Sequence, residues 1–285
     1  MNSHALQQRK YDKMAQKTAS LTINASHNYT YLLRELAITD FRLKYQGSAI
    51  GYLWSISKPL AVFGILYTVF TVFLRVGSDI PHYPVYLLLG VVLWSFVSEC
   101  STYGMRSIVD KGDLMRKIYF PRIILVIAST ISATITLLIN LLVVVLFLLI
   151  ARVFPQPLAI AEFILLLVEL YVLCLGLSFL LSSLYTKFRD ISHIWEVFLQ
   201  LLFYASAVIY PLAAVPSKYR TLLTLNPVTQ ILQDSRYLLV TKNTVTPSHL
   251  LHHGLIIVPY IIPFLLLGLG YSLFNRSAAH FAEEV

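Results

Sequence analysis

Side chains with the chemistry of a reaction centre are few in this sequence. Four glutamates fall inside or at the ends of apolar segments, namely Glu99, Glu162, Glu169 and Glu196. A carboxylate within an apolar segment is costly, so each is a functional hypothesis by default. Glu162 and Glu196 lie near the ends of their segments, where water hydrates them cheaply, and we interpret both as structural. The roles of Glu99 and Glu169 stay open on the sequence alone.

The motifs of common catalytic centres are absent. No His and Cys residues have metal-ligand spacing, and no Ser, His and Asp residues stand in the context of a nucleophile elbow. No G-x-x-x-x-G-K-[ST] occurs, so the chain has no P-loop of its own. Cys100 and Cys174 lie in apolar segments and predict buried thiols rather than a disulfide. We therefore expect neither an enzyme nor a bound metal or cofactor.

The most informative stretch is residues 40–59, DFRLKYQGSAIGYLWSISKP, which joins a charged segment directly to the first long apolar run. Residues 29–46 are amphipathic on a helical wheel, a pattern typical of a helix lying at a membrane surface. We expect this interfacial helix over residues 29–50. Its apolar stripe holds Tyr29, Leu32, Leu33, Leu36 and Leu43, opposite Arg34, Glu35, Arg42 and Gln46.

Asp40 falls on the apolar stripe of that helix, where an unpaired carboxylate is unfavourable. It could pair with Lys44 one turn later. It could instead cap a second short helix that begins after Thr39. A solvated kink at this point is a third interpretation, and the sequence does not choose among them.

The composition predicts an integral membrane protein. Hydrophobic residues make up 57% of the 285 residues, charged residues only 13%, and the mean hydropathy is +0.71. Soluble domains carry about a quarter charged residues. A span needs about 20 apolar residues, which leaves room for an all-α bundle of six helices. The predicted spans are 52–74, 83–103, 121–150, 160–183, 193–210 and 255–274.

Lys and Arg are distributed unequally between the two sides of these spans. Sixteen fall on the side of both termini and six on the other. The positive-inside rule therefore places both termini in the cytoplasm. Topology and anionic lipid account for the net charge of +8, so nucleic acid is not needed as a partner.

Two loops break the pattern of plain connections. Residues 105–121, MRSIVDKGDLMRKIYFP, predict a short helix exposing both charged and apolar side chains, which suits docking into a groove of another protein. A basic loop that only satisfies topology is the alternative. Residues 211–254 are too polar to span and too regular for a random loop, so we expect two short helices that dip back into the outer leaflet.

The chain also lacks any visible source of energy. Its membrane carboxylates do not form the paired inverted repeats of an ion-coupled carrier. A docking loop without a nucleotide site indicates that ATP hydrolysis takes place on a separate subunit. Any ATP and Mg²⁺ would then be bound by that subunit.

From about residue 28 onward the chain resembles the permease subunits of ABC-2-type exporters, in the branch that moves O-antigen, capsular polysaccharide or teichoic acid. The motifs that carry the resemblance are DFRLKY at residues 40–45, GYLW at 51–54 with Pro59, residues 117–121, Tyr210-Pro211, Asn226-Pro227 with Arg236, and His280-Phe281-Ala282. The resemblance implies a homodimer on two copies of an ABC ATPase, with a channel at the dimer interface. It also implies loading of a lipid-pyrophosphate-linked glycan from the cytoplasm across the plasma or inner membrane.

The resemblance divides the chain into a cytoplasmic tail (1–28), the interfacial helix (29–50), the six-helix domain (51–276) and a second cytoplasmic tail (277–285). The expected ATPase-coupling loop holds Asp110, Lys111, Asp113, Leu114, Arg116 and Lys117. The expected interfacial residues, where substrate enters, are Arg34, Asp40, Arg42, Lys44 and Tyr45. Tyr and Phe offer stacking faces to sugars. The candidates to line the channel are Phe63, Tyr67, Phe70, Phe198 and Tyr204.

Two other classes of protein stay open. An ABC-2 exporter of drugs or lipids would have the same architecture and a different cargo. A membrane-embedded glycosyltransferase would need acidic metal ligands in a loop, and the close aspartates Asp110 and Asp113 have basic neighbours that make them poor ligands.

Overall fold

The computed structural model describes residues 25–45, 51, 53–75, 80–117, 120–251, 254–278 and 281, and all regular structure within them is helical. The predictions for residues 1–24 of the N-terminal tail, for residues 46–50, and for Tyr52, His280 and Ala282 lie outside the described residues. The side chain of Tyr45 does so as well. Residues 25–28, also predicted as tail, belong to the first described helix.

Among the residues that the structure describes, five helices are long and apolar enough to cross a membrane, which confirms a polytopic all-α protein. They are α3 (Leu53–Tyr67) with its π-helical continuation η1 (Thr68–Phe73), α4 (Tyr83–Arg106), α6 (Ile123–Ile150), α7 (Pro157–Lys187) and α12 (Val258–Ala278). The predicted span over residues 193–210 is instead α8 (Ile191–Ala205), an apolar helix of 15 residues. It is shorter than the about 20 residues that a full crossing takes.

α4 is the central helix of the bundle. In its apolar window 72% of the residues are buried, against 11% for α3 with η1. α4 packs on α6 and α7, while α12 packs along α7. The close approach of α7 and α12 depends on two glycines, because a Cβ on Gly176 would lie 2.6 Å from the backbone nitrogen of Leu267, and a Cβ on Gly270 would overlap the carbonyl oxygen of Gly176.

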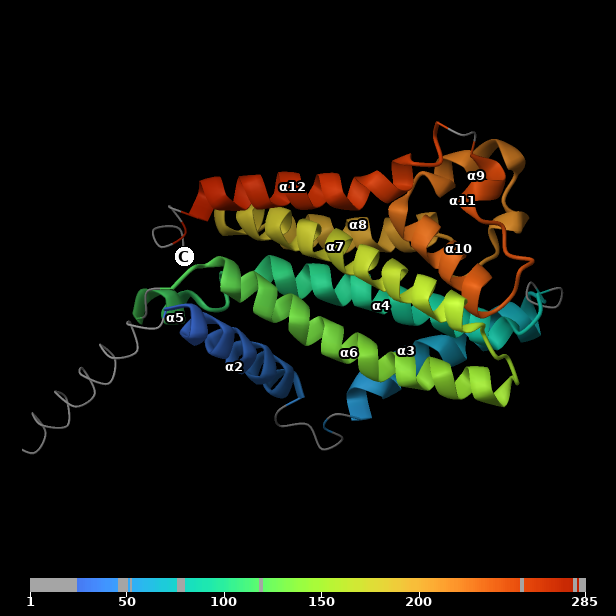
Figure 1. Cartoon of the computed structure of the whole chain (residues 1–285), viewed down its shortest axis with the longest axis horizontal. Coiled ribbons are helices and arrows are strands. Elements are labelled where there is room, and N and C mark those ends of the chain that lie inside the picture. The colour runs from blue at the N-terminus through green and yellow to red at the C-terminus, as the bar shows by residue number, and fades with distance from the viewer. Residues whose placement is uncertain are drawn as a thin grey trace, which may run out of the picture.

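Short elements cover one end of the bundle, as Figure 1 shows. They are the 3₁₀ turn η2 (Leu212–Ala214), α9 (Ser217–Thr224), α10 (Pro227–Leu239) and α11 (Pro247–Leu250). α10 begins where the sequence favours it, because Pro227 occupies the first turn and the Asn226 side chain accepts a hydrogen bond of 3.0 Å from the Val228 backbone amide. The expected pair of short helices in residues 211–254 is thus present as α9 and α10, with two shorter elements beside them.

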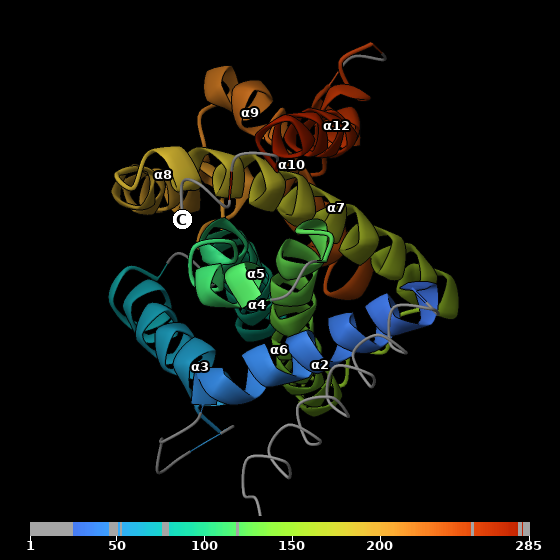
Figure 2. The same cartoon turned by 90° about the vertical axis from the view of Figure 1, so that its left-hand side faces the viewer.

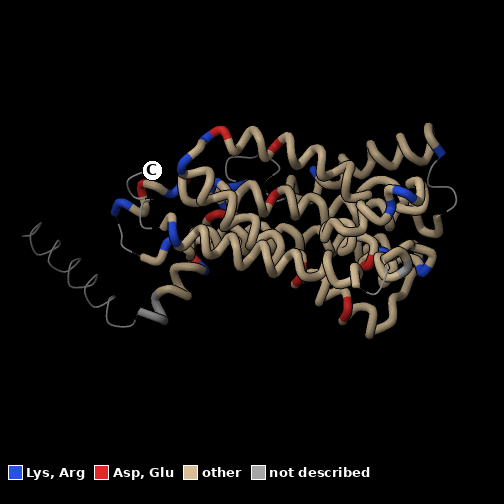
Figure 3. Tube along the Cα trace, turned by 90° about the horizontal axis from the view of Figure 1, so that it is seen from above, with Lys and Arg blue, Asp and Glu red and all other residues tan. Residues whose placement is uncertain are grey.

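The opposite end, here named the α5 end, carries α5 (Gly112–Lys117), the start of α2 (Ala25–Tyr45) and the last turns of α12 (Figure 1). There the ring of Phe281 contacts that of Phe274, with centroids 5.2 Å apart. Lys and Arg gather at the two ends of the molecule, and the long middle is almost free of them (Figure 3). This distribution is what a membrane-spanning bundle requires.

α2 crosses α6 obliquely (Figure 2) and packs on it through Leu32, Leu33 and Leu36. It is one continuous helix, so the suggestion of a second helix after Thr39 is wrong. The predicted apolar stripe is only partly correct. Leu43 is exposed at 59%, whereas Ala37, which the wheel did not include, is exposed at only 2%.

Candidate functional site

A cavity of about 580 Å³ lies between α3, α4 and α6, next to the last turn of α2. Its walls combine aromatic rings with hydroxyl, amide and charged groups. The polar and aromatic lining residues are Lys44, Trp54, Ser55, Lys58, Trp94, Ser95, Phe96, Ser98, Glu99, Thr102, Tyr103, Thr136, Asn140 and Phe203. Such a wall suits a ligand that is hydroxylated rather than purely apolar.

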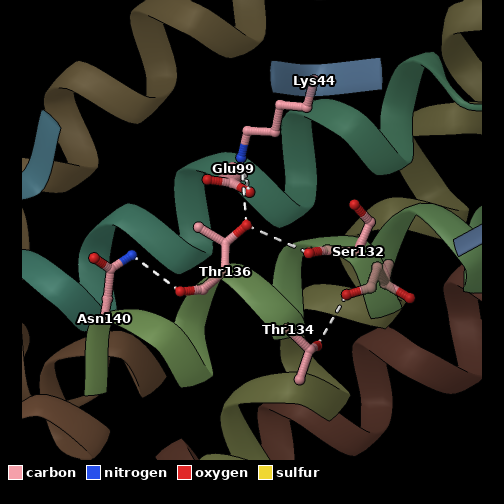
Figure 4. A network of polar contacts seen from close by, with 7 residues as sticks. Lys44, Glu99, Ser132, Thr134, Thr136 and Asn140 are labelled. Atoms are coloured by element: carbon pink, nitrogen blue, oxygen red, sulfur yellow. Dashed lines mark hydrogen bonds and ion pairs between the residues drawn. The ribbon is translucent and has the colours of Figure 1, made fainter. Parts of the chain in front are cut away.

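An ion pair between Lys44 of α2 and Glu99 of α4 lies at this cavity (Figure 4). Both side chains are half-buried, with 17% and 21% of their surface exposed. The Lys44 ammonium also lies 3.4 Å from the Thr136 hydroxyl and 5.2 Å from the centre of the Tyr103 ring. Thr136 lies about 20 Å from Ile123, the first residue of α6, at a rise of about 1.5 Å per residue. The Lys44 ammonium therefore contacts the middle of α6 rather than its end.

The observed ion pairs exclude one of the three interpretations of Asp40. Asp40 does not pair with Lys44. Its carboxylate forms an ion pair with Lys111, in the turn that precedes α5, and both side chains are half-buried. The sequence wheel placed Asp40 on the buried face of the helix correctly, but it could not show a partner 71 positions away.

A second cavity of about 580 Å³ lies between α4 and α8. It shares Trp94, Ser98, Thr102 and Tyr103 of α4 with the first cavity, so α4 presents one polar and aromatic strip to both. Phe203 of α8 also lines both cavities. Its other side belongs mainly to α8, which contributes Ser192, Trp195, Glu196, Gln200 and Tyr204. The Trp195 indole is fixed by a hydrogen bond of 3.1 Å to the Ser101 hydroxyl.

The two cavities together offer rings for stacking and hydroxyls for hydrogen bonds. They also hold basic groups, because Lys58 lines the first cavity and makes no ion pair within the described part of the chain. The same part of the chain contains no group of three His, Cys, Asp or Glu residues that could hold a metal ion. The arrangement can bind a polar, anionic, hydroxylated molecule.

The predicted coupling residues lie together at the α5 end. Asp110, Asp113, Arg116 and Lys117 are exposed, while Leu114 is half-buried against the core beneath α5. The short helix expected in residues 105–121 is α5, which begins at Gly112. The structure therefore presents a charged surface that Leu114 and Met115 attach to the core, with Lys111 paired to Asp40 of α2.

The other predicted interfacial residues differ in position. Arg34 and Arg42 are exposed on α2, and neither lines the cavity. Lys44 does line it. Of the two basic residues expected at the C-terminal end of α2, the structure brings only Lys44 to the site.

The predicted aromatic residues divide into two groups. Phe63 is buried, with its ring stacked on Tyr67 at 5.7 Å and edge-on to Phe147 at 5.5 Å. Phe63, Tyr67 and Phe70 therefore contribute to helix packing within this chain, and none of them lines the two cavities. Phe198 stacks on Trp195 and is exposed at 48%, and Tyr204 lines the second cavity and is exposed at 62%.

Glu169 belongs to a separate polar cluster near the end covered by α10. The amide of Gln230 donates to Asp234 at 3.0 Å and approaches Glu169 at 3.5 Å. The Tyr260 hydroxyl donates to Asp234 at 2.7 Å. This cluster joins α7, α10 and α12, and it borders a cavity of about 450 Å³ that Glu162 also lines. Glu169 thus lies where α7 meets α10.

Several site residues were not singled out by the sequence analysis, chiefly Lys58, Trp94, Ser98, Thr102 and Tyr103. Trp94, Ser98 and Thr102 recur every four residues, and this spacing on one helix face was the pattern that could have revealed them. A similar series on α6, Ala128, Ser132, Thr136 and Asn140, has the spacing typical of a helix-packing face. All four are buried, yet Thr136 and Asn140 also line the cavity.

Residues 31–240 match the sequence profile of the ABC-2 type transporter family. The match covers most of the chain, and the chain therefore belongs to that family. It is 26% identical over 266 residues to an O-antigen export system permease protein RfbA of Klebsiella pneumoniae, covering 92% of this chain and 99% of the relative.

Two further relatives are also named as polysaccharide transport proteins. An O-antigen export system permease protein RfbA of Myxococcus xanthus is 24% identical, with 91% of this chain and 97% of the relative covered. The polysialic acid transport protein KpsM of Escherichia coli is 26% identical, with 70% and 78% covered. The similarity to the O-antigen permeases thus extends over nearly the full length of both chains.

Proposed function

We propose that this chain is the permease subunit of an ATP-driven exporter that carries a lipid-linked polysaccharide across the plasma or inner membrane. The observation that carries the proposal is the strip of Trp94, Ser98, Thr102 and Tyr103 on α4, which faces two adjoining cavities inside a membrane-spanning bundle. Rings and hydroxyls in alternation match the faces and edges of sugar rings. The similarity to permeases of O-antigen and polysialic acid supports the same class of cargo.

In this proposal the chain works as a homodimer on two copies of a separate ABC ATPase, which binds ATP and Mg²⁺. The exposed charges of α5 form the docking surface for the ATPase, so the α5 end and both termini face the cytoplasm. α3 supports the presence of a second copy, because only 11% of its apolar window is buried within one chain. Lipid covers what the second copy leaves exposed. Phe198 and Tyr204 on α8 are the aromatic candidates for the channel wall.

The proposal is tested in the cells that make the protein. Deleting the gene should remove the polysaccharide from the cell surface while its lipid-linked form accumulates on the inner side of the membrane. A glycosyltransferase would give the opposite result, because its loss removes the lipid-linked polymer itself. An exporter of drugs or unrelated lipids would leave the surface polysaccharide unchanged. Either of these two results would contradict the proposal.

A further inference from the structure

We infer that Lys44, Lys58 and Glu99 form a phosphate-binding site in the cavity between α3, α4 and α6, in which Glu99 and a phosphate ester compete for Lys44. This inference deepens the proposed function, because the pyrophosphate linkage of a lipid-linked glycan would supply the phosphate. It assigns an intramembrane carboxylate that the sequence left open, and it adds Lys58, which no motif singled out.

Two ammonium groups reach this cavity from different elements. Lys58 comes from α3 and makes no ion pair among the described residues. Lys44 comes from the end of α2 and pairs with Glu99. The formal charge of the three groups is +1, so the cavity attracts an anion even while the ion pair is intact. Ammonium groups bind phosphate oxygens through charge-assisted hydrogen bonds, which are stronger than neutral ones.

The ion pair is open to competition. Lys44 and Glu99 both line the cavity and keep 17% and 21% of their surface exposed, so a third group can reach the lysine. Lys44 also has supports besides Glu99, since its ammonium lies 3.4 Å from the Thr136 hydroxyl and 5.2 Å from the Tyr103 ring centre. It would therefore stay in place while Glu99 turns away. An ion pair with a purely structural role would be closed to the cavity, and its lysine would have no other contacts to hold it in place.

The surroundings favour a sugar phosphate over a bare phosphate. Trp54, Trp94 and Tyr103 line the same cavity as the two lysines, and their faces can stack on a sugar ring next to the bound phosphate. The headgroup of an anionic phospholipid offers the same phosphate chemistry without a ring that needs those faces. The two sources are separated by the experiment below.

The experiment measures binding of a polyprenyl diphosphate to the purified chain in nanodiscs of phosphatidylcholine. Two of the three tryptophans, Trp54 and Trp94, line the cavity. Trp195 belongs to the wall of the second cavity. In a background with Trp94→Phe and Trp195→Phe, the fluorescence comes from Trp54 alone, which lines this cavity and not the second one.

Glu99→Gln should tighten binding about tenfold, because it removes the competitor and leaves Lys44 in place. Lys58→Gln should weaken binding about tenfold or more, which corresponds to the loss of one charged hydrogen bond. Lys44→Gln should weaken it similarly, and Glu99→Gln should have no further effect in that background, since Glu99 acts through Lys44. Unchanged or weaker binding in Glu99→Gln, or unchanged binding in Lys58→Gln, would overturn the inference.

Three controls keep the test decisive. Lys218→Gln, on α9 at the far end of the bundle, should leave binding unchanged. Lys58 is exposed, so its variant tests the site even if Glu99→Gln were to fold poorly. Adding phosphatidylglycerol to the nanodiscs separates the sources, because competition with the diphosphate would assign the same site to a phospholipid headgroup. Binding is measured without export or ATP, so failure of the proposed function would not by itself alter these results.

Discussion

Lys111, in the turn before α5, forms an ion pair with Asp40 of α2, which lies 71 positions earlier in the chain. One helical turn further along α2, Lys44 pairs with Glu99 of α4. α2 is therefore attached at one point to the segment proposed for ATPase docking and at another to the wall of the first cavity. We expect the loss of either ion pair to loosen α2 from the segment that it joins.

Replacing Asp40 by Asn should reduce export several-fold without loss of ATPase binding, because the half-buried Lys111 loses its partner. Charged hydrogen bonds contribute about 1.5–3 kcal/mol each, so Lys111→Gln should have a similar effect. Exchanging the charges, as Asp40→Lys with Lys111→Asp, should restore part of the activity. Surface polysaccharide and co-purification of the ATPase are the two measurements. Additive losses with no recovery in the exchanged pair would show that the two residues act independently.

Charge reversal at Arg116 and Lys117 should weaken association with the ATPase and leave membrane insertion intact. Both side chains are exposed on α5, and charges at the rim of an interface govern docking more than folding. Pull-down of the ATPase from detergent-solubilised membranes measures the effect. Lys218→Glu at the other end of the bundle serves as the control. If both variants recovered the ATPase equally, the basic residues of α5 would serve only the membrane topology and not docking.

The sequence predicted the long helices because their apolar runs have the length that a membrane crossing demands. It also predicted a short helix in residues 105–121, from its mixture of charged and apolar residues, and two short helices in residues 211–254, which are too polar to span and too regular for a random loop. The sequence overestimated how far α8 extends, because an apolar run shows hydrophobicity but not the residue at which the helix ends. After Ala205 the chain leaves the helix, and Ala207 adopts a positive φ of 50°.

The contacts within the candidate site were harder to predict from the sequence than the helices, and the reason is physical. Lys44 and Asp40 each had a possible partner one turn away, and local spacing offers no means to prefer distant ones such as Glu99 or Lys111. The same limit applies to Phe63, whose packing against Phe147 depends on how α3 meets α6. Periodicity predicts which face of a helix is buried, but the identity of the neighbour follows only from the tertiary arrangement.

Arg236 should be essential for folding of the end covered by α10. Its side chain is fully buried and donates hydrogen bonds to the carbonyl oxygens of Tyr86, Ala207 and Val208. Its guanidinium also lies 3.8 Å from the centre of the Tyr86 ring. Arg236→Leu leaves these acceptors unpaired at about 1–3 kcal/mol each, and Arg236→Lys loses the planar fork.

The thermal unfolding midpoint in detergent measures this effect, with Arg220→Lys on α9 as a comparison. Arg220 also donates to backbone carbonyls, those of Val215 and Ala213, but its Ala213 contact is exposed. We expect a much larger decrease for either Arg236 variant. Equal decreases in the unfolding midpoint for the Arg236 and Arg220 variants would mean that the burial of Arg236 does not increase its contribution to stability.

Gly270→Ala should destabilise the bundle, and Gly268→Ala should not. A Cβ at Gly270 would overlap the carbonyl oxygen of Gly176 on α7, whereas a Cβ at Gly268 meets nothing within 4 Å. Both lie in α12, so the two variants gain the same intrinsic helix preference of about 1 kcal/mol. Comparison of their unfolding midpoints isolates the contact between helices. A stabilised Gly270→Ala variant would contradict the packing described for α7 and α12.

The purified chain alone should release no phosphate from ATP, because it has no P-loop. Activity should appear only when the ABC ATPase is added. Phosphate release is measured for the chain, for the ATPase and for the two together. Robust turnover by the chain alone would contradict the division of labour between subunits.

The most direct test of the account is transport of a lipid-linked polysaccharide in inverted membrane vesicles that contain the chain and its ATPase. The lipid-linked polymer is supplied on the outer face of the vesicles, which corresponds to the cytoplasm, and its protection from an added glycosidase is followed over time. We predict protection that requires ATP, the ATPase and this chain together. Protection that is independent of the chain, or no protection when all three are present, would contradict the central claim.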